Sequence, residues 1–335
     1  MQGERQDGYL VAIIGAGPAG LYAARQLANA GVHVVLFNRD IKPGGLAEYG
    51  IYPDKYKMKE GLRNQFRQIL TSPLVEYYGN VRVGGGGDVT LDDLRKLGFQ
   101  AFLITVGAQG TKWLGLPGEE LRRVYHAKDV VYHYNKLPPF SQRDFPVGRR
   151  VAVVGAGNVM MDIAHWLVRS VKVDEVLVVV RRGPAQVKFD KREFEIVAAN
   201  IDRPALDAEV ARVTPVMQAI GQDPEKAKAD ILAGLARALP PVSATQVRFQ
   251  FLASPVRIIG DDSGCMSGLE VEDNALAVVE GDVKARGLGT RRVLDVDTVI
   301  FAIGDRVEEQ FGLPLQKGEF AKNPNPSFPI EGISY

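Results

Sequence analysis

Cysteine is nearly absent from the sequence, because only Cys265 is present among 335 residues. Within this chain an internal disulfide, a Cys-x-x-Cys redox pair and a cysteine-held iron–sulfur cluster are therefore excluded. The thiol relay of disulfide reductases is excluded for the same reason. If the protein moves electrons, the carrier must be a bound organic cofactor. Cys265 itself is expected to be a structural thiol.

An excess of charge and a long apolar run are also lacking. The 41 basic and 40 acidic side chains leave a net charge of +1, too little for a global field that gathers nucleic acid or anionic membrane. No apolar run approaches the roughly 18 to 20 residues that cross a bilayer. The four histidines show no metal-ligand spacing. We expect a cytoplasmic protein without a metal, a nucleic-acid partner or a membrane partner.

Glycine is abundant, with 36 residues, and the first glycine cluster follows a short apolar run. Leu10 to Ile14 has strand character, Gly15-Ala-Gly17-Pro-Ala-Gly20 follows it, and a helix-forming stretch runs from Leu21 to Ala30. In such a unit the first glycine permits a sharp turn, the second lets the backbone approach a pyrophosphate, and the third lets helix and strand pack closely. The pattern predicts a dinucleotide site.

The strand expected at Val32 to Phe37 ends at Asn38, where such folds usually place an acid that accepts ribose hydroxyls. Asn38 can still accept a hydrogen bond but has no charge. Downstream, Gly44-Gly45-Leu46 allows the chain to run close to a flat ligand, although a plain surface loop is the alternative. Gly84 to Gly87 lacks the Gly-Lys-Ser/Thr ending of a nucleotide loop, so a flexible surface turn is expected.

The same architecture occurs a second time. Val151 to Val154 reads as a strand and Gly155-Ala-Gly157-Asn158-Val159-Met160 as the turn. Met161 to Arg169 has helical apolar spacing, and Glu175 to Val180 reads as the next strand. Arg181 and Arg182 stand where NAD sites have an acid, and guanidiniums are natural partners of a 2′-phosphate. FAD has no 2′-phosphate, so the first loop suits FAD and the second suits NADPH. The length of 335 residues allows two such domains.

The residues resemble the adrenodoxin reductase-type ferredoxin-NADP reductases, glutathione reductase-like flavoproteins with two dinucleotide sites. The NADPH-oxidising small subunit of glutamate synthase is a near cousin. The most specific match is Val180-Arg181-Arg182-Gly183-Pro184, continuing through Gln186-Val187 and Phe189 to Glu193. Further matches are Gly79-Asn80-Val81, Leu116-Pro117-Gly118-Glu119, the run from Gly157 to Asp162, and Phe249 to Pro255.

The resemblance implies the positions that contact each cofactor. FAD contacts are expected at Gly15, Gly17, Gly20, Asn38, Gly45, Leu46 and the backbone near Val81. NADP(H) contacts are expected in the loop with Gly155 and Gly157 and at Asn158, Val159, Arg181, Arg182 and Glu193. Asp162 matches the family's acid beside the nicotinamide, with an exposed helix acid as the alternative. Asp162 and Lys55 are the candidate catalytic residues, which orient the nicotinamide or relay a proton.

Two departures from the family pattern stand out. Asn38 replaces the family glutamate, and the chain stops at Tyr335 before the segment that normally covers the flavin, so an incomplete C-terminus is expected. The stretch Thr298 to Asp305 resembles that closing segment, but its place in the family order favours the strand that returns the chain to the first domain.

The predicted fold is α/β, with two Rossmann-like dinucleotide-binding domains and the NADPH domain inserted in the FAD domain. Residues 1–110 begin the FAD domain, 111–303 form the NADPH domain, and 304–335 return to the FAD domain. The segment Asp202 to Ser243 carries no motif, and Pro224 to Leu239 reads as a helix that covers a sheet or, as the alternative, meets a partner.

The predicted function is hydride transfer from NADPH to FAD, followed by electron delivery to ferredoxin or a similar protein acceptor. One alternative is the electron-input subunit of an amidotransferase-like complex, which the run Lys57-Met58-Lys59 favours. Another is a dinucleotide-binding module without turnover. The acceptor and the oligomeric state are left open.

Overall fold

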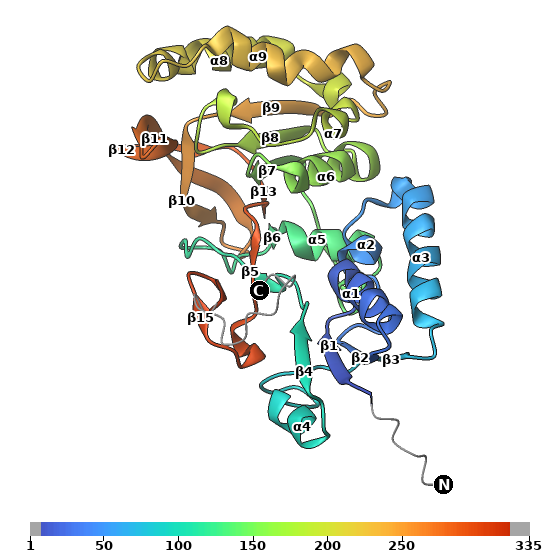
Figure 1. The fold of residues 1–335 in the computed structure, drawn as a ribbon. Helices are drawn as coiled ribbons and strands as arrows, with labels where there is room; N and C mark the ends of the chain where they lie inside the picture. The colour runs from blue at the N-terminus through green and yellow to red at the C-terminus, as the bar shows by residue number, and fades with distance from the viewer. Residues whose placement is uncertain (1–7, 322–335) are drawn as a thin grey trace. The chain divides into compact units, whose positions relative to one another are not determined.

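The computed structural model describes residues 8–321 of the chain. The chain divides into two compact units (Figure 1). Of the described residues, 8–111 and 305–321 belong to unit 1, and 112–304 belong to unit 2. Unit 2 is thus an insertion in the sequence of unit 1.

Unit 1 is built on a four-stranded parallel sheet in the order β3-β2-β1-β4. The strands are β1 (Leu10–Ile14), β2 (His33–Asn38), β3 (Val75–Gly79) and β4 (Ala101–Ile104). Its helices are α1 (Pro18–Asn29), α2 (Leu46–Tyr49), α3 (Tyr56–Leu70) and α4 (Leu91–Lys96). The return segment adds β14 (Asp305–Arg306), paired with β5 (Gly110–Thr111), and the hairpin β15 (Leu315–Gln316) and β16 (Glu319–Phe320).

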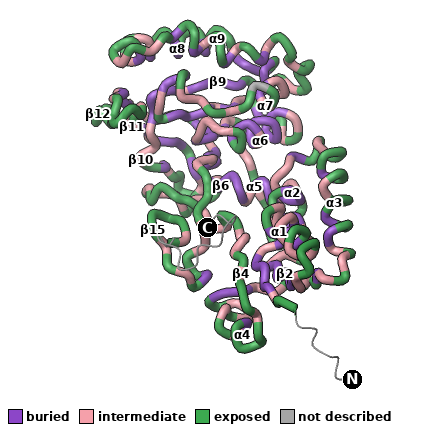
Figure 2. The backbone as a smooth tube through the Cα atoms, in the orientation of Figure 1, coloured by how far each residue is buried: buried purple, intermediate pink, exposed green. Residues whose placement is uncertain are grey.

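The unit 1 sheet contains many buried residues (Figure 2), and alternate residues of its strands belong to two separate cores. Ile13 and Leu36 pack with α1 and α3, whereas Ile14 and Phe37 face the opposite side. Phe311 of the return segment joins this second core. The period of two therefore buries both faces of the sheet, as expected for a parallel sheet covered on each side.

Unit 2 is built on a five-stranded parallel sheet in the order β6-β13-β7-β8-β9. These strands are β6 (Val124–His126), β13 (Thr298–Phe301), β7 (Arg150–Val154), β8 (Glu175–Val179) and β9 (Gln246–Gln250). The helices α5 (Ala127–Tyr134), α6 (Asn158–Trp166) and α7 (Lys191–Glu195) belong to the same unit. A three-stranded antiparallel sheet follows, formed by β10 (Ala253–Gly260), β11 (Met266–Val279) and β12 (Asp282–Leu294).

The segment 202–243 forms two helices, α8 (Arg203–Gln218) and α9 (Pro224–Leu232), which lie over β8 and β9 in Figure 1. Leu206, Val210 and Val213 on α8 are buried. The predicted helix over 224–239 is too long, because the α-helix ends at Leu232 and a 3-10 turn covers Ala233–Arg237. Thr298–Phe301 lies inside the unit 2 sheet as β13, after which the chain returns to unit 1. Over residues 8–321 there is no helix with the length and apolar character needed to span a bilayer.

Candidate functional site

The first glycine of the first loop makes the turn between β1 and α1. Gly15 has a φ of +104°, and a Cβ added there would lie 2.5 Å from the carbonyl oxygen of Thr105. The N–H of Gly15 donates to the carbonyl oxygen of Phe37 at 2.8 Å, which ties the turn to the end of β2. A side chain is thus excluded both by backbone conformation and by the approach of the next strand connection.

The other two glycines of this loop differ in what surrounds them. A Cβ at Gly20 would lie 2.1 Å from the carbonyl oxygen of Gly15 and 2.7 Å from Oγ1 of Thr105, so close packing of helix and turn requires glycine there. A Cβ at Gly17 would meet nothing within 4 Å. Open space therefore lies at the N-terminus of α1, where free N–H groups and the helix dipole favour a phosphate.

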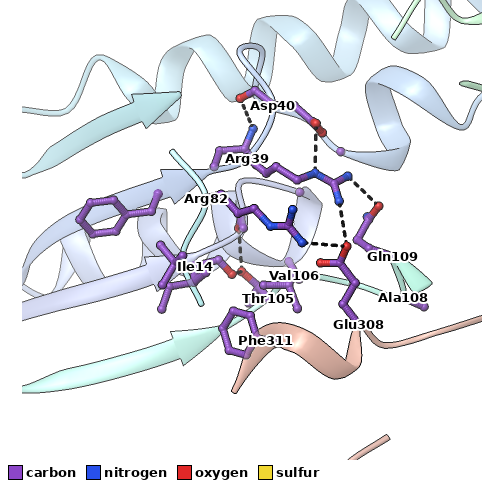
Figure 3. A pocket seen from close by; sticks show the side chains of 18 of the residues that line it. Ile14, Arg39, Asp40, Arg82, Thr105, Val106, Ala108, Gln109, Glu308 and Phe311 are labelled. Atoms are coloured by element: carbon purple, nitrogen blue, oxygen red, sulfur yellow. Dashed lines mark hydrogen bonds and ion pairs between the residues drawn. The ribbon is translucent and has the colours of Figure 1, made fainter. Parts of the chain in front are cut away.

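That space belongs to a cavity of about 370 Å³ at the carboxyl ends of the unit 1 strands (Figure 3). Its lining comes from the first loop, the end of β2, the Gly45 turn, the 81–83 segment, the chain after β4, and the return segment. The lining residues are Ile14, Gly15, Gly17, Pro18, Ala19, Phe37, Asn38, Arg39, Asp40, Gly45, Leu46, Val81, Arg82, Val83, Thr105, Val106, Gly107, Ala108, Gln109, Glu308 and Phe311. Carboxyl ends of strands in open α/β sheets are the usual ligand site.

The Gly44-Gly45 turn packs directly on the first loop. Gly44 N–H donates to the carbonyl oxygen of Ala16 at 2.7 Å, and a Cβ at Gly45 would lie 3.0 Å from Cα of Gly17. Behind the turn, the buried Glu48 accepts two hydrogen bonds from Arg63, each of 2.7 Å. The hydrogen-bonded guanidinium lowers the pKa of the Glu48 carboxyl, against the raising effect of burial. The turn is therefore a fixed part of the cavity wall.

Asn38, a predicted FAD contact, lines the cavity, and its amide is used within the protein. Its Oδ1 accepts the N–H of Ala16 at 3.1 Å, and its Nδ2 donates to the carbonyl oxygens of Asp40 and Lys42 at 2.7 and 3.2 Å. The side chain is 7% exposed. Asn38 thus holds the phosphate loop and the following turn together. Val81 also lines the cavity, and its N–H donates to the carbonyl oxygen of Asn38 at 3.0 Å.

Several lining residues were not predicted. Oγ1 of Thr105 donates to the carbonyl oxygen of Gly15 at 2.7 Å and so locks the first turn; its place directly after β4 could have revealed it. Arg39 and Arg82 meet Glu308, which comes from the return segment more than two hundred residues later (Figure 3). No local sequence signal identifies Glu308.

Gly84 and Gly85 do more than form the predicted surface turn. A Cβ at Gly84 would lie 2.8 Å from the carbonyl oxygen of Phe311, and one at Gly85 would lie 2.8 Å from that of Gln310. Gly84 is buried. The glycines are therefore required because the return segment passes against their backbone.

The second loop, in unit 2, repeats the geometry of the first. Gly155 has a φ of +134°, its N–H donates to the carbonyl oxygen of Val179 at 3.0 Å, and an added Cβ would lie 2.3 Å from the carbonyl oxygen of Ala302. A Cβ at Gly157 would meet nothing within 4 Å. Met160 occupies the third position and is fully buried, so the helix packs through a side chain instead of by backbone approach.

The remaining predicted residues of the second site surround this loop. Val159 is 44% exposed at the start of α6. Arg181 is exposed, whereas Arg182 is half-buried and its Nη1 lies 3.4 Å from the carbonyl oxygen of Val283. Oδ1 of Asn158 accepts the N–H of Asp190 at 2.7 Å, which ties the 187–190 segment to the loop. Glu193 lies half-buried in α7. Among the ion pairs of residues 8–321, none involves Arg181 or Arg182.

The two candidate catalytic residues lie in different units. Lys55 is half-buried at the start of α3 in unit 1, and Asp162 is half-buried on α6 in unit 2. In the Lys57-Met58-Lys59 run, Lys57 is exposed but Lys59 is 7% exposed and donates to the carbonyl oxygen of Ile51 at 3.4 Å. Burial lowers the pKa of the Lys59 ammonium.

Comparison with known proteins places this arrangement in a family. The family model described as pyridine nucleotide-disulphide oxidoreductase matches residues 9–231. The chain belongs to the pyridine nucleotide-disulphide oxidoreductase family. It is 32% identical over 88% of its length to the mitochondrial NADPH:adrenodoxin oxidoreductase of Salvelinus fontinalis, of which it covers 65%. It is 30% identical over 92% of its length to the NADPH-ferredoxin reductase FprA of Mycobacterium tuberculosis, of which it covers 73%.

A solved structure of Mycobacterium tuberculosis FprA in complex with NADPH superposes with a TM-score of 0.77 at 28% identity and covers 97% of this chain and 77% of that one. The chain thus spans about two thirds to three quarters of the length of these relatives. The predicted fold, with two dinucleotide-binding units, is confirmed.

Membership of the pyridine nucleotide-disulphide oxidoreductase family does not bring disulphide chemistry to this chain. Its single cysteine, Cys265, lies in unit 2 at the turn between β10 and β11. A dithiol relay needs two cysteines, and these 335 residues supply one.

Proposed function

We propose that the chain binds FAD in unit 1 and NADPH in unit 2, and that it passes electrons from NADPH through FAD to a separate protein such as a ferredoxin. Residues 1–110 with 304–335 would form the FAD-binding domain, and residues 111–303 the NADPH-binding domain. The relatives named NADPH:adrenodoxin oxidoreductase and NADPH-ferredoxin reductase support this proposal. The single cysteine is in keeping with it, because an internal thiol relay and a cysteine-held iron–sulfur cluster are excluded within this chain.

The observation that carries the assignment is the different charge at the two loops. In unit 1, Arg39 and Arg82 are paired with Glu308, so the cavity has no free cationic pair for a 2′-phosphate. In unit 2, Arg181 and Arg182 follow β8 and are outside the ion pairs of the described residues. An uncompensated guanidinium pair beside a helix N-terminus suits the 2′-phosphate of NADPH.

The residues of unit 1 fit FAD at the level of the backbone. The space beside Gly17 faces the N-terminus of α1 and would receive the pyrophosphate, while Thr105 fixes the loop and Gly45 and Leu46 line the wall. When bound, FAD accepts a hydride from reduced nicotinamide and can release electrons one at a time. Lys55 and Asp162 remain our candidates for orienting the nicotinamide or holding a proton, and no strong general acid is required.

The first test is the visible spectrum of the purified chain, recorded before and after anaerobic addition of NADPH. Flavin bands that bleach with NADPH are expected, followed by reduction of an added ferredoxin in a cytochrome c-coupled assay. A colourless protein that still binds NADPH would contradict the assignment of FAD to unit 1. Bleaching without any ferredoxin reduction would leave the cofactors in place but contradict the acceptor.

The second test measures the preference of unit 2 for NADPH over NADH. Arg181→Ala and Arg182→Ala should each weaken NADPH binding by about 10- to 100-fold, because each removes a charged hydrogen bond of about 1.5 to 3 kcal/mol. NADH binding should change little. Arg203→Ala, an exposed arginine at the start of α8, is the matched control. Equal losses for NADPH and NADH would overturn the assignment of the arginine pair.

The identity of the acceptor and the compartment stay predictions. The amidotransferase-type alternative rests on the Lys57-Met58-Lys59 run, which supplies one exposed charge fewer than its sequence implies because Lys59 is buried. The expected cytoplasmic location is not decided by the relatives, whose names include mitochondrial proteins.

A further inference from the structure

The end of β2 lacks the carboxylate that a dinucleotide fold normally presents to the adenosine ribose. Asn38 occupies that position, and its amide oxygen and nitrogen are engaged by Ala16 N–H and by the carbonyl oxygens of Asp40 and Lys42. The next residue is Arg39. By position alone, this end of the cavity resembles a site for a phosphorylated ribose more than a site for FAD.

A second guanidinium reaches the same end of the cavity. Arg82, after β3, lines the wall with Arg39, and their side chains are 42% and 36% exposed (Figure 3). Two guanidiniums at this end of one cavity are well suited to grip a phosphate group, which accepts charged and bidentate hydrogen bonds.

Glu308 offsets the positive charge of these two arginines. Its Oε1 lies 3.7 Å from Nη1 of Arg39 and 3.5 Å from Nη2 of Arg82, so one carboxylate oxygen serves both arginines. Arg39 is held further by Asp40 at 3.5 Å and by Gln109 Oε1 at 3.0 Å. With both acids in place the four charged side chains sum to zero.

The backbone around Glu308 is built to hold it there. Two residues before it, β14 pairs with β5, and a Cβ at Gly110 would lie 2.8 Å from the carbonyl oxygen of Val307. Two and three residues after it, the carbonyl oxygens of Gln310 and Phe311 lie against Gly85 and Gly84. Phe311 is 6% exposed in the second core of unit 1. The backbone that carries Glu308 is thus fixed on both sides.

We propose that Glu308 determines the ligand specificity of the first site. Together with Asp40, its carboxylate balances the charges of Arg39 and Arg82, so the cavity accepts an adenosine whose ribose is unphosphorylated and rejects one that carries a 2′-phosphate. This inference rests on the proposed function in taking FAD as the ligand of unit 1. The return segment thereby supplies a charge that β2 lacks.

The test is displacement of FAD from the full chain, followed by flavin fluorescence, with 5′-ADP and adenosine 2′,5′-bisphosphate as competitors. All proteins carry Arg181→Ala and Arg182→Ala, so that the second site does not take up the 2′-phosphorylated competitor. Glu308→Gln should shift the ratio of the two inhibition constants by at least about tenfold in favour of the bisphosphate. Glu309→Gln is the matched control, because Glu309 pairs with Arg306 and is not among the cavity lining.

A second measurement tests whether Arg82 binds the 2′-phosphate of the competitor. Adding Arg82→Gln to Glu308→Gln should remove most of the gain for the bisphosphate. Glu308 is 36% exposed and glutamine matches its size, so folding should be preserved, which a thermal melt checks. A ratio that stays at the unsubstituted value in Glu308→Gln, with FAD still bound, would overturn the role of Glu308 while leaving the proposed function intact. Failure of the unsubstituted chain to bind FAD would instead refute the proposed function.

Discussion

The middle glycine of each phosphate loop can be tested without disturbing the fold. Gly17 has φ −74° and ψ −179°, Gly157 has φ −110° and ψ −175°, and an added Cβ would meet nothing within 4 Å at either position. Alanine is therefore compatible with backbone and packing, and Gly17→Ala or Gly157→Ala should change the free energy of unfolding by less than about 1 kcal/mol. The new methyl would occupy the space proposed for a pyrophosphate. Loss of about two charged hydrogen bonds would weaken binding by roughly 3 kcal/mol or more, about 100-fold.

The assay is paired titration of each variant with FAD and with NADPH, together with urea unfolding of the free protein. Gly17→Ala should lose FAD and keep NADPH, whereas Gly157→Ala should do the reverse. Gly61→Ala is the control, because Gly61 is also surrounded by open space but belongs to α3 and not to either glycine loop. If Gly17→Ala bound FAD as tightly as the unsubstituted chain, the pyrophosphate would not lie at the N-terminus of α1. Loss of both ligands in one variant would indicate misfolding, and unfolding curves would show it.

Two further predictions concern buried ionisable groups. Arg63→Met leaves the buried Glu48 without its guanidinium and should lower the free energy of unfolding at pH 7 by about 2 kcal/mol, less than for a fully buried pair because Arg63 is half-exposed. The loss should shrink as acid protonates Glu48, because Arg63 lowers the pKa of that carboxyl in the folded state. Arg67→Met on the same helix is the control and should have little effect on the free energy of unfolding. His126 is 2% exposed, and burial lowers its pKa from 6.5 to about 4, so the unfolded chain binds its proton first and stability should fall by about 2 kcal/mol between pH 7 and pH 5. His126→Asn should flatten this pH dependence in urea unfolding while keeping an acceptor for the N–H at the start of α5; an unchanged slope would exclude His126 as its source.

The repeated strand, glycine turn and helix could be predicted from the sequence because the information is local. The strand at Leu10–Ile14 has the predicted bounds, and β7 and β8 agree with prediction within one residue at each end. The helices start earlier than predicted, at Pro18 and Asn158, because proline and asparagine are tolerated in the first turn, where no N–H needs a helical partner. Glycine spacing thus identified the loops correctly even where the helix boundaries were displaced.

Helix α8 could not be predicted from its own residues. Pro215 lies inside it and Glu209 lies on its buried face, so its sequence does not read as an amphipathic helix. The structure resolves the conflict, because Oε1 of Glu209 accepts the N–H of Phe251 at 2.6 Å and the carboxylate also pairs with Arg212. A buried acid of this kind is acceptable only when its partners are present. Arg212 is local, but the N–H of Phe251 comes from the residue after β9, about forty residues later.

The charge balance of the unit 1 cavity is the feature that is hardest to predict from the sequence. The rule that arginine in place of an acid indicates a 2′-phosphate applies equally to Asn38-Arg39 and to Arg181-Arg182. Applied locally, it would assign phosphorylated ribose to both sites. Two acids separate the first site from the second: Asp40, which follows Arg39 directly, and Glu308, which the return segment brings to Arg39 and Arg82. We therefore expect the net charge that the fold assembles around the ribose to set the ligand of the first site, and we expect its preference to shift if the Glu308 carboxylate is neutralised.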